Sequence, residues 1–179
     1  MTYLLDTMVV GFFQRAGRQA DLAAAASVCP MAVVGEVRVE LANGTEFGGG
    51  KFRNWFAGSG IQVLDLVVGS PAQITLGNLV GAIASVKNLG ERASIALAAS
   101  DSSLTFVTHD KGAMWLALRE IWEPGERILG VSVFLRRLFE QGTIRDVAVL
   151  DEVIGQIAVA HRPTWWAEWR ASVTAVRNR

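Results

Sequence analysis

Apolar and polar positions along the chain follow two spacings, one typical of short strands and the other of helices. Thr2 to Leu5 is a short apolar run, and Thr7 to Gly17 has the spacing of a helix that ends at a glycine. The same alternation recurs further on. The other predicted strands are Met31 to Val34, Ile61 to Leu66, Leu104 to Thr108 and Arg127 to Leu129. The other predicted helices are Ala20 to Ser27, Gly35 to Ala42, Pro71 to about Val86, Glu91 to about Ser100, a helix from Asp110 to about Trp122, Val131 to Gln141, Asp146 to Val159 and Thr164 to Val176.

Strands that alternate with helices predict an α/β fold. Four or five such strands would form a central parallel sheet with helices on both faces, connected by right-handed crossovers. The 179 residues, 51% of them apolar, suffice for one sizeable core. We therefore expect a single domain over residues 1–179, with a helical C-terminal extension at about 143–179.

The charge and cysteine content narrow the functional classes. Seventeen basic residues balance seventeen acidic ones, which argues against a protein that binds long nucleic acid mainly by neutralising many phosphates. The single cysteine, Cys29, excludes an internal disulfide and a cysteine-based zinc site. The N-terminus lacks the pattern of a secretory signal, and charged residues interrupt every long apolar stretch. We expect a cytoplasmic protein that does not enter a membrane.

Acidic residues follow the predicted strands at the positions where ligands of parallel sheets collect. Asp6 directly follows the first strand, and Asp110 comes just after the strand that ends at Thr108. Glu91 opens the helix that leads to that strand, which places it at the same edge of the sheet. Glu36 and Glu40 share one face of another helix, because they are four residues apart. At least four carboxylates can therefore converge.

Carboxylates held close together repel one another unless protons or a cation compensate their charge. Mg²⁺ prefers oxygen ligands and usually keeps some water, so it suits an open carboxylate site that also accepts a phosphate oxygen. One or two such ions can activate water and stabilise the leaving oxygen at phosphorus. The carboxylates therefore indicate nuclease chemistry.

Short motifs at these acids resemble a known family. Tyr3 to Thr7 resembles the opening strand and first acid of PIN-domain nucleases. Glu40-Leu41 is similar to the family's second acid, Gly90-Glu91 to its third, and Val107 to Asp110 to the Thr-x-Asp that carries the fourth. Ile128 to Gly142 resembles a C-terminal segment found in one branch of the family. Each motif is weak alone, and their order and spacing carry the resemblance.

The resemblance covers roughly residues 2 to 160 and implies a Rossmann-like PIN domain that cleaves RNA with Mg²⁺ or Mn²⁺. Many members are toxins that a small antitoxin protein neutralises. The catalytic and metal-binding residues implied here are Asp6, Glu40, Glu91 and Asp110, supported by Thr7 and Thr108.

Purely structural interpretations stand beside these roles. Asp6 or Asp110 could simply cap the helix that follows it, and Glu91 could be favoured by the helix dipole. Thr7 is either a cap or a hydroxyl near the metal, and Thr108 could serve only to fix the loop around Asp110. Candidates for holding phosphates are Arg15, Arg18, Lys51, Arg53 and Lys111, although a solvated surface is the safer assumption for each.

One histidine and a group of tryptophans are further candidates for functional roles. His109 should point away from Asp110 along an extended chain, so we expect no catalytic role for it. Trp165, Trp166 and Trp169 could stack on bases, but core or interface packing is the favoured interpretation. The tail that carries them could contact a partner protein or a second copy in a homodimer.

The leading hypothesis is therefore a Mg²⁺- or Mn²⁺-dependent endoribonuclease, the toxin of a toxin and antitoxin pair. The alternative is a catalytically inactive PIN-like binding or scaffold domain, because Met8 stands where many members have asparagine. A third class is a phosphatase or small-molecule hydrolase with a similar acidic site.

Overall fold

The computed structural model describes residues 1–44, 50–81 and 88–177. Its centre is a parallel sheet of five strands in the order β3-β2-β1-β4-β5. The strands are β1 (Thr2–Leu5), β2 (Met31–Val34), β3 (Gln62–Leu64), β4 (Leu104–Thr108) and β5 (Ile128–Gly130). The expected α/β class and parallel sheet are confirmed.

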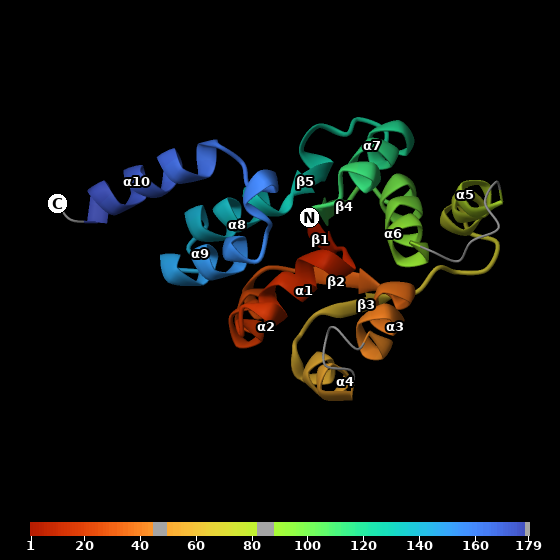
Figure 1. Ribbon diagram of the computed structural model, residues 1–179. Coiled ribbons are helices and arrows are strands. Elements are labelled where there is room, and N and C mark those ends of the chain that lie inside the picture. The colour runs from red at the N-terminus through yellow and green to blue at the C-terminus, as the bar shows by residue number, and fades with distance from the viewer. Residues whose placement is uncertain (45–49, 82–87, 178–179) are drawn as a thin grey trace.

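Helices connect the strands and flank the sheet. They are α1 (Thr7–Arg15), α2 (Gln19–Val28), α3 (Gly35–Asn43), α4 (Gly50–Gly58), α5 (Pro71–Val80), α6 (Leu89–Ser100), α7 (Lys111–Glu120), α8 (Val131–Glu140), α9 (Val147–Gly155) and α10 (Trp165–Arg177), with short 3-10 turns η2 (Gly125–Arg127) and η3 (Val159–His161). In Figure 1, α1, α2, α8 and α9 lie on one side of the sheet, whereas α6 and α7 lie on the other. The expected helices on both faces are therefore present.

The three central strands are buried because both faces of the sheet are covered. All residues of β2 and β4 are buried, as are Tyr3, Leu4 and Leu5 of β1. Such uninterrupted apolar strands are typical of parallel sheets. Leu5 pairs with Val107, so β1 and β4 end side by side. This register brings the residues that follow the two strands to the same edge of the sheet.

Several element boundaries differ from the prediction. The helix expected from Asp146 to Val159 ends at Gly155, and η3 follows after a short connection. The strand expected over residues 61–66 is shorter, because β3 covers only Gln62–Leu64. The expected continuation of α5 to about Val86 falls largely outside the described residues.

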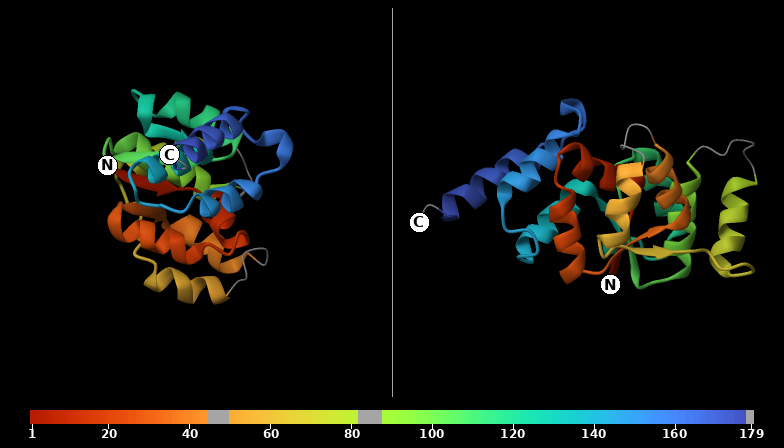
Figure 2. Two further views of the ribbon diagram at one scale, coloured as in Figure 1. Left: turned by 90° about the vertical axis from the view of Figure 1, so that its left-hand side faces the viewer. Right: turned by 90° about the horizontal axis from the view of Figure 1, so that it is seen from below.

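The C-terminal helix α10 packs through tryptophans on the helices that precede it. Trp166 is only 7% exposed, its ring centroid is 4.9 Å from that of Trp169, and the Trp169 ring is 5.6 Å from that of Phe139 on α8. The Arg170 guanidinium pairs with Asp151 on α9. Packing, the interpretation favoured above, is confirmed for Trp166. Figure 2 shows from two further directions that α10 leads away from the sheet to the C-terminus.

No helix in the described part of the chain combines the length and the apolar character needed to cross a bilayer.

Candidate active site

Asp6 lies between β1 and α1, at the carboxyl edge of the sheet. Its backbone N–H donates to the carbonyl of Val107 at 3.0 Å, which extends the pairing of β1 with β4 by one residue. Its side chain is 5% exposed and makes no capping hydrogen bond to α1 among the described residues. Capping therefore does not explain the Asp6 side chain.

Thr108, the last residue of β4, links the two acids that follow the central strands. Its side chain is fully buried, and its hydroxyl donates to Oδ2 of Asp6 at 2.8 Å. The Thr108 hydroxyl oxygen in turn accepts a hydrogen bond from the backbone N–H of Asp110 at 3.1 Å. Thr108 therefore orients the Asp6 carboxylate as well as the backbone at Asp110, so its role is not limited to the loop around Asp110.

Asp110 is the N-cap of α7. Its Oδ1 accepts from the backbone N–H of Ala113 at 2.9 Å, so the capping interpretation is correct for this residue. The side chain is nevertheless exposed at the edge of the sheet and close enough to Asp6 and Glu91 to raise the pKa of both. The cap and a place in the acidic cluster are compatible.

Glu40 reaches across from α3 to the starts of two other helices. Its Oε2 accepts from the hydroxyl of Thr7 at 2.5 Å, and its Oε1 accepts from the backbone N–H of Gly90 at 3.0 Å. A Cβ on Gly90 would lie 2.9 Å from Oε1, so this close approach requires glycine. Glu36 makes neither contact, and its buried Oε2 has no hydrogen-bond partner among the described residues. Glu40 is the member of the pair that joins α1 to α6.

Asp6 and Glu91 carry the electrostatic signature of a crowded acidic site. Burial, reinforced by Glu40 and Asp110, raises the pKa of Asp6 to about 6, although the hydrogen bond from Thr108 opposes the shift. Burial, together with Asp6, Asp110 and Glu40, raises the pKa of Glu91 to about 7, against the opposing effect of Arg92. Asp6, Glu40 and Asp110 therefore all lie within electrostatic range of Glu91, and Glu40 and Asp110 also lie within range of Asp6.

The donor set suits a hard divalent cation, because every candidate ligand is a carboxylate oxygen and burial disfavours uncompensated charge. The arrangement is not a preformed cage, however. Among the described residues, no three His, Cys, Asp or Glu side chains are placed so that they could hold a metal ion together. Both oxygens of Glu40 and Oδ1 of Asp110 already accept hydrogen bonds. Binding of an ion would require these side chains to adjust.

A cavity of about 320 Å³ adjoins Asp110 on the side of α7. It is lined by Met8, His109, Asp110, Lys111, Gly112 and His161. The His109 ring packs edge-on against Phe12, with 5.3 Å between centroids, and burial lowers the pKa of His109. His109 and Asp110 both border this cavity, and the expectation that His109 has no catalytic role stays a prediction.

His161 was not singled out from the sequence. It belongs to η3, far from Asp110 along the chain, and no local motif surrounds it. Only the packing of the C-terminal segment against earlier parts of the chain, α9 on α1 among them, brings His161 to the cavity.

The basic residues that were candidates for holding phosphates differ in where their side chains lie. Arg18 pairs with Glu152 and Asp21 instead of facing the acids, whereas Lys111 lines the cavity beside Asp110. The side chains of Lys51 and Arg53 lie outside the described residues.

Comparison of the chain with protein-family models, with curated proteins and with solved structures found no match.

Proposed function

We propose that this protein is an endoribonuclease that depends on Mg²⁺ or Mn²⁺. The observation that carries the proposal is the convergence of four carboxylates from separate segments, where crowding and burial raise the pKa of Asp6 and Glu91. Such a set gains most from a divalent cation, which compensates the repulsion. When bound, an ion of this kind activates water and stabilises the leaving oxygen at phosphorus.

In this proposal some residues would bind the ion, and others orient the residues that bind it. Asp6, Glu40, Glu91 and Asp110 would hold the ion. Thr108 orients Asp6 through its hydroxyl, and Thr7 with the backbone N–H of Gly90 orients Glu40. These hydrogen bonds restrict the rotation of Asp6 and Glu40 in the metal-free protein, and an ion would bind after the carboxylates adjust toward it.

The direct test is cleavage of single-stranded RNA by the purified protein with Mg²⁺ or Mn²⁺, with and without EDTA. We expect EDTA to abolish cleavage and Asp6→Asn to lower kcat/KM by more than about 100-fold, since a ligated ion supplies several kcal/mol of stabilisation. Asp101→Asn is the matched control, because Asp101 follows α6 at the opposite end from Glu91. Cleavage that survives both EDTA and Asp6→Asn would refute the proposal.

A second candidate is a PIN-like module that binds without cleaving. It is favoured by the hydrogen bonds that already occupy both oxygens of Glu40 and by the absence, among the described residues, of a ready set of three metal ligands. RNA binding without cleavage in either metal would support this candidate over the first.

The toxin role adds a biological setting to the enzyme. In this setting the protein cuts cytoplasmic RNA, and a small antitoxin protein or a second copy of the chain is its partner. Expression in a bacterial host should arrest growth, and Asp6→Asn should relieve the arrest. Normal growth with soluble and active wild-type protein would reject the toxin role while leaving the nuclease proposal intact.

A further inference from the structure

The cavity beside Asp110 differs in character from the acidic cluster that it adjoins. Its volume is about 320 Å³, and three of the six described residues that line it have side-chain nitrogen atoms, namely His109, Lys111 and His161. Among the described residues that line the cavity, Asp110 is the only acid, and its Oδ1 accepts a hydrogen bond from the backbone N–H of Ala113. The cavity therefore offers hydrogen-bond donors, including one permanent cation, next to a group of carboxylates.

His161 reaches the cavity because the segment after α9 is held in a defined turn. The Arg162 guanidinium donates to the carbonyl of Ile157 and to that of Gly155, both at 2.8 Å. These two bonds tie η3 back onto the end of α9. The backbone N–H of His161 also donates to the carbonyl of Ala158 at 2.8 Å.

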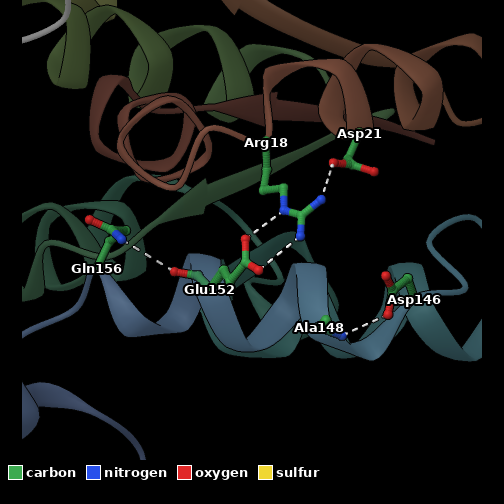
Figure 3. A network of polar contacts seen from close by, with 6 residues as sticks. All are labelled: Arg18, Asp21, Asp146, Ala148, Glu152 and Gln156. Atoms are coloured by element: carbon green, nitrogen blue, oxygen red, sulfur yellow. Dashed lines mark hydrogen bonds and ion pairs between the residues drawn. The ribbon is translucent and has the colours of Figure 1, made fainter.

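The helix α9 is itself fastened to the N-terminal part of the chain. Arg18 donates to both carboxylate oxygens of Glu152, at 2.6 and 2.8 Å, and contacts Asp21 at 3.7 Å. Figure 3 shows Arg18 between the two acids, one on α2 and the other on α9. This ion pair connects α9 to the start of α2.

We propose that this cavity binds a phosphodiester of single-stranded RNA, with Lys111 supplying the charge and His109 and His161 supplying ring N–H donors. Naming the strand as RNA rests on the proposed function. A strand whose scissile phosphate lies at the acids would place a neighbouring phosphate in the cavity, because Asp110 borders both. Two imidazoles and a lysine suit the oxygens of a phosphate, which accept hydrogen bonds and carry negative charge.

A metal site is the other use of two histidines beside an aspartate. The lining does not favour it, because Lys111 borders the same cavity and would repel a cation.

The test measures binding without catalysis. The probe is a fluorescently labelled pool of 20-nucleotide single-stranded RNA of random sequence, titrated with the full chain in EDTA at several salt concentrations. We expect His161→Ala to weaken binding about 10- to 100-fold, as loss of a hydrogen bond to a charged group does. Lys111→Ala should weaken it similarly and make the slope of log K against log salt shallower by about 0.7.

Two matched variants separate a contact from a disturbance of the fold. His161→Asn keeps an N–H donor and should retain most of the affinity, and Val159→Ala on the exposed side of η3 should retain all of it. Unchanged affinity in both His161→Ala and Lys111→Ala would overturn the inference, as would wild-type protein that does not bind the pool.

The outcome is independent of cleavage. If the variants weaken RNA binding but no metal supports cleavage, the phosphate site stands and the nuclease proposal falls. If cleavage is found and the variants bind normally, the nuclease proposal stands and the phosphate site falls.

Discussion

At the scale of single residues, the hydroxyl of Thr108 connects the two acids that follow the central strands. It donates its proton to Asp6 and accepts from the backbone N–H of Asp110. A buried hydroxyl that donates to a carboxylate stabilises the charged form, and this lowers the pKa of Asp6. Burial has the larger and opposite effect, so the net result is a carboxyl group whose pKa is raised to about 6.

This raised pKa predicts that the metal-free protein loses stability as the pH rises. In the unfolded chain Asp6 ionises near pH 3.8, whereas in the folded protein its pKa is about 6. Between these values the folded protein binds more protons than the unfolded chain, so its free energy of unfolding falls with pH. The loss from Asp6 is about 3 kcal/mol and is complete above about pH 7. Glu91, with a pKa raised to about 7, contributes in the same direction.

Urea unfolding in EDTA at pH 5 and pH 8 measures this loss, and Asp6→Asn supplies the comparison. The neutral asparagine should flatten the dependence on pH and make the protein more stable than the wild type at pH 8. Adding Mn²⁺ at pH 8 should stabilise the wild type but not the variant, since only the wild type offers the carboxylate. A wild-type stability that rises between pH 5 and pH 8 would contradict the argument.

At the scale of elements, the candidate site depends on how closely α3 approaches the start of α6. Gly90 lies at the contact, where Glu40 accepts its backbone N–H. A Cβ there would lie 2.9 Å from both Oε1 of Glu40 and Cγ2 of Val37. Val37 is fully buried, so it cannot easily move away. The absence of a side chain at Gly90 therefore allows the two helices to meet.

Gly90→Ala should force α3 and α6 apart. We expect a loss of about 1–3 kcal/mol in the free energy of unfolding, as for overpacking of a core, and a fall in RNA cleavage as Glu40 shifts. Gly77→Ala on α5 is the matched control, because no described atom lies within 4 Å of the added carbon. It should stabilise the protein by up to about 1 kcal/mol, since alanine favours a helix over glycine. Equal effects of the two substitutions, measured by urea unfolding, would refute the packing argument.

At the scale of the whole molecule, the C-terminal segment completes the surroundings of the site. The pair Arg18–Glu152 joins residues 134 positions apart, and His161 follows shortly after on the same segment. Both side chains of this pair are partly exposed to solvent, so the pair adds little to the free energy of unfolding and serves mainly to position α9. The segment extends the edge of the sheet with a donor that the strands and their loops do not supply.

Glu152→Gln should loosen α9 and η3 without unfolding the sheet. We expect faster amide hydrogen exchange in the segment 147–161 and a modest loss of RNA affinity, smaller than that of His161→Ala. Glu140→Gln is the matched control, since Glu140 pairs with Arg136, which lies one turn away within α8. Amide hydrogen exchange is measured by mass spectrometry. Exchange rates in the segment 147–161 that equal those of the wild type in both variants would contradict this prediction.

The acids of the candidate site could be predicted to different degrees. Asp6 and Asp110 follow strands whose apolar runs are plain in the sequence, so their location at one edge of the sheet follows from the strands being parallel. The choice of Glu40 over Glu36 could not be made from spacing alone, because the two share a helical face. It depends on contacts with Thr7 and Gly90, which lie 33 and 50 residues away from Glu40.

The amino-acid sequence by itself determined the strands, their parallel arrangement and every described helix except α4, because these depend on the local period of apolar residues. It also determined which acids stand at the ends of strands. Tertiary structure alone decided the pairing of Glu40 with the starts of α1 and α6, the raised pKa values and the approach of His161 to Asp110. These features depend on packing between distant segments, and neither local periodicity nor short motifs record which distant side chains will meet.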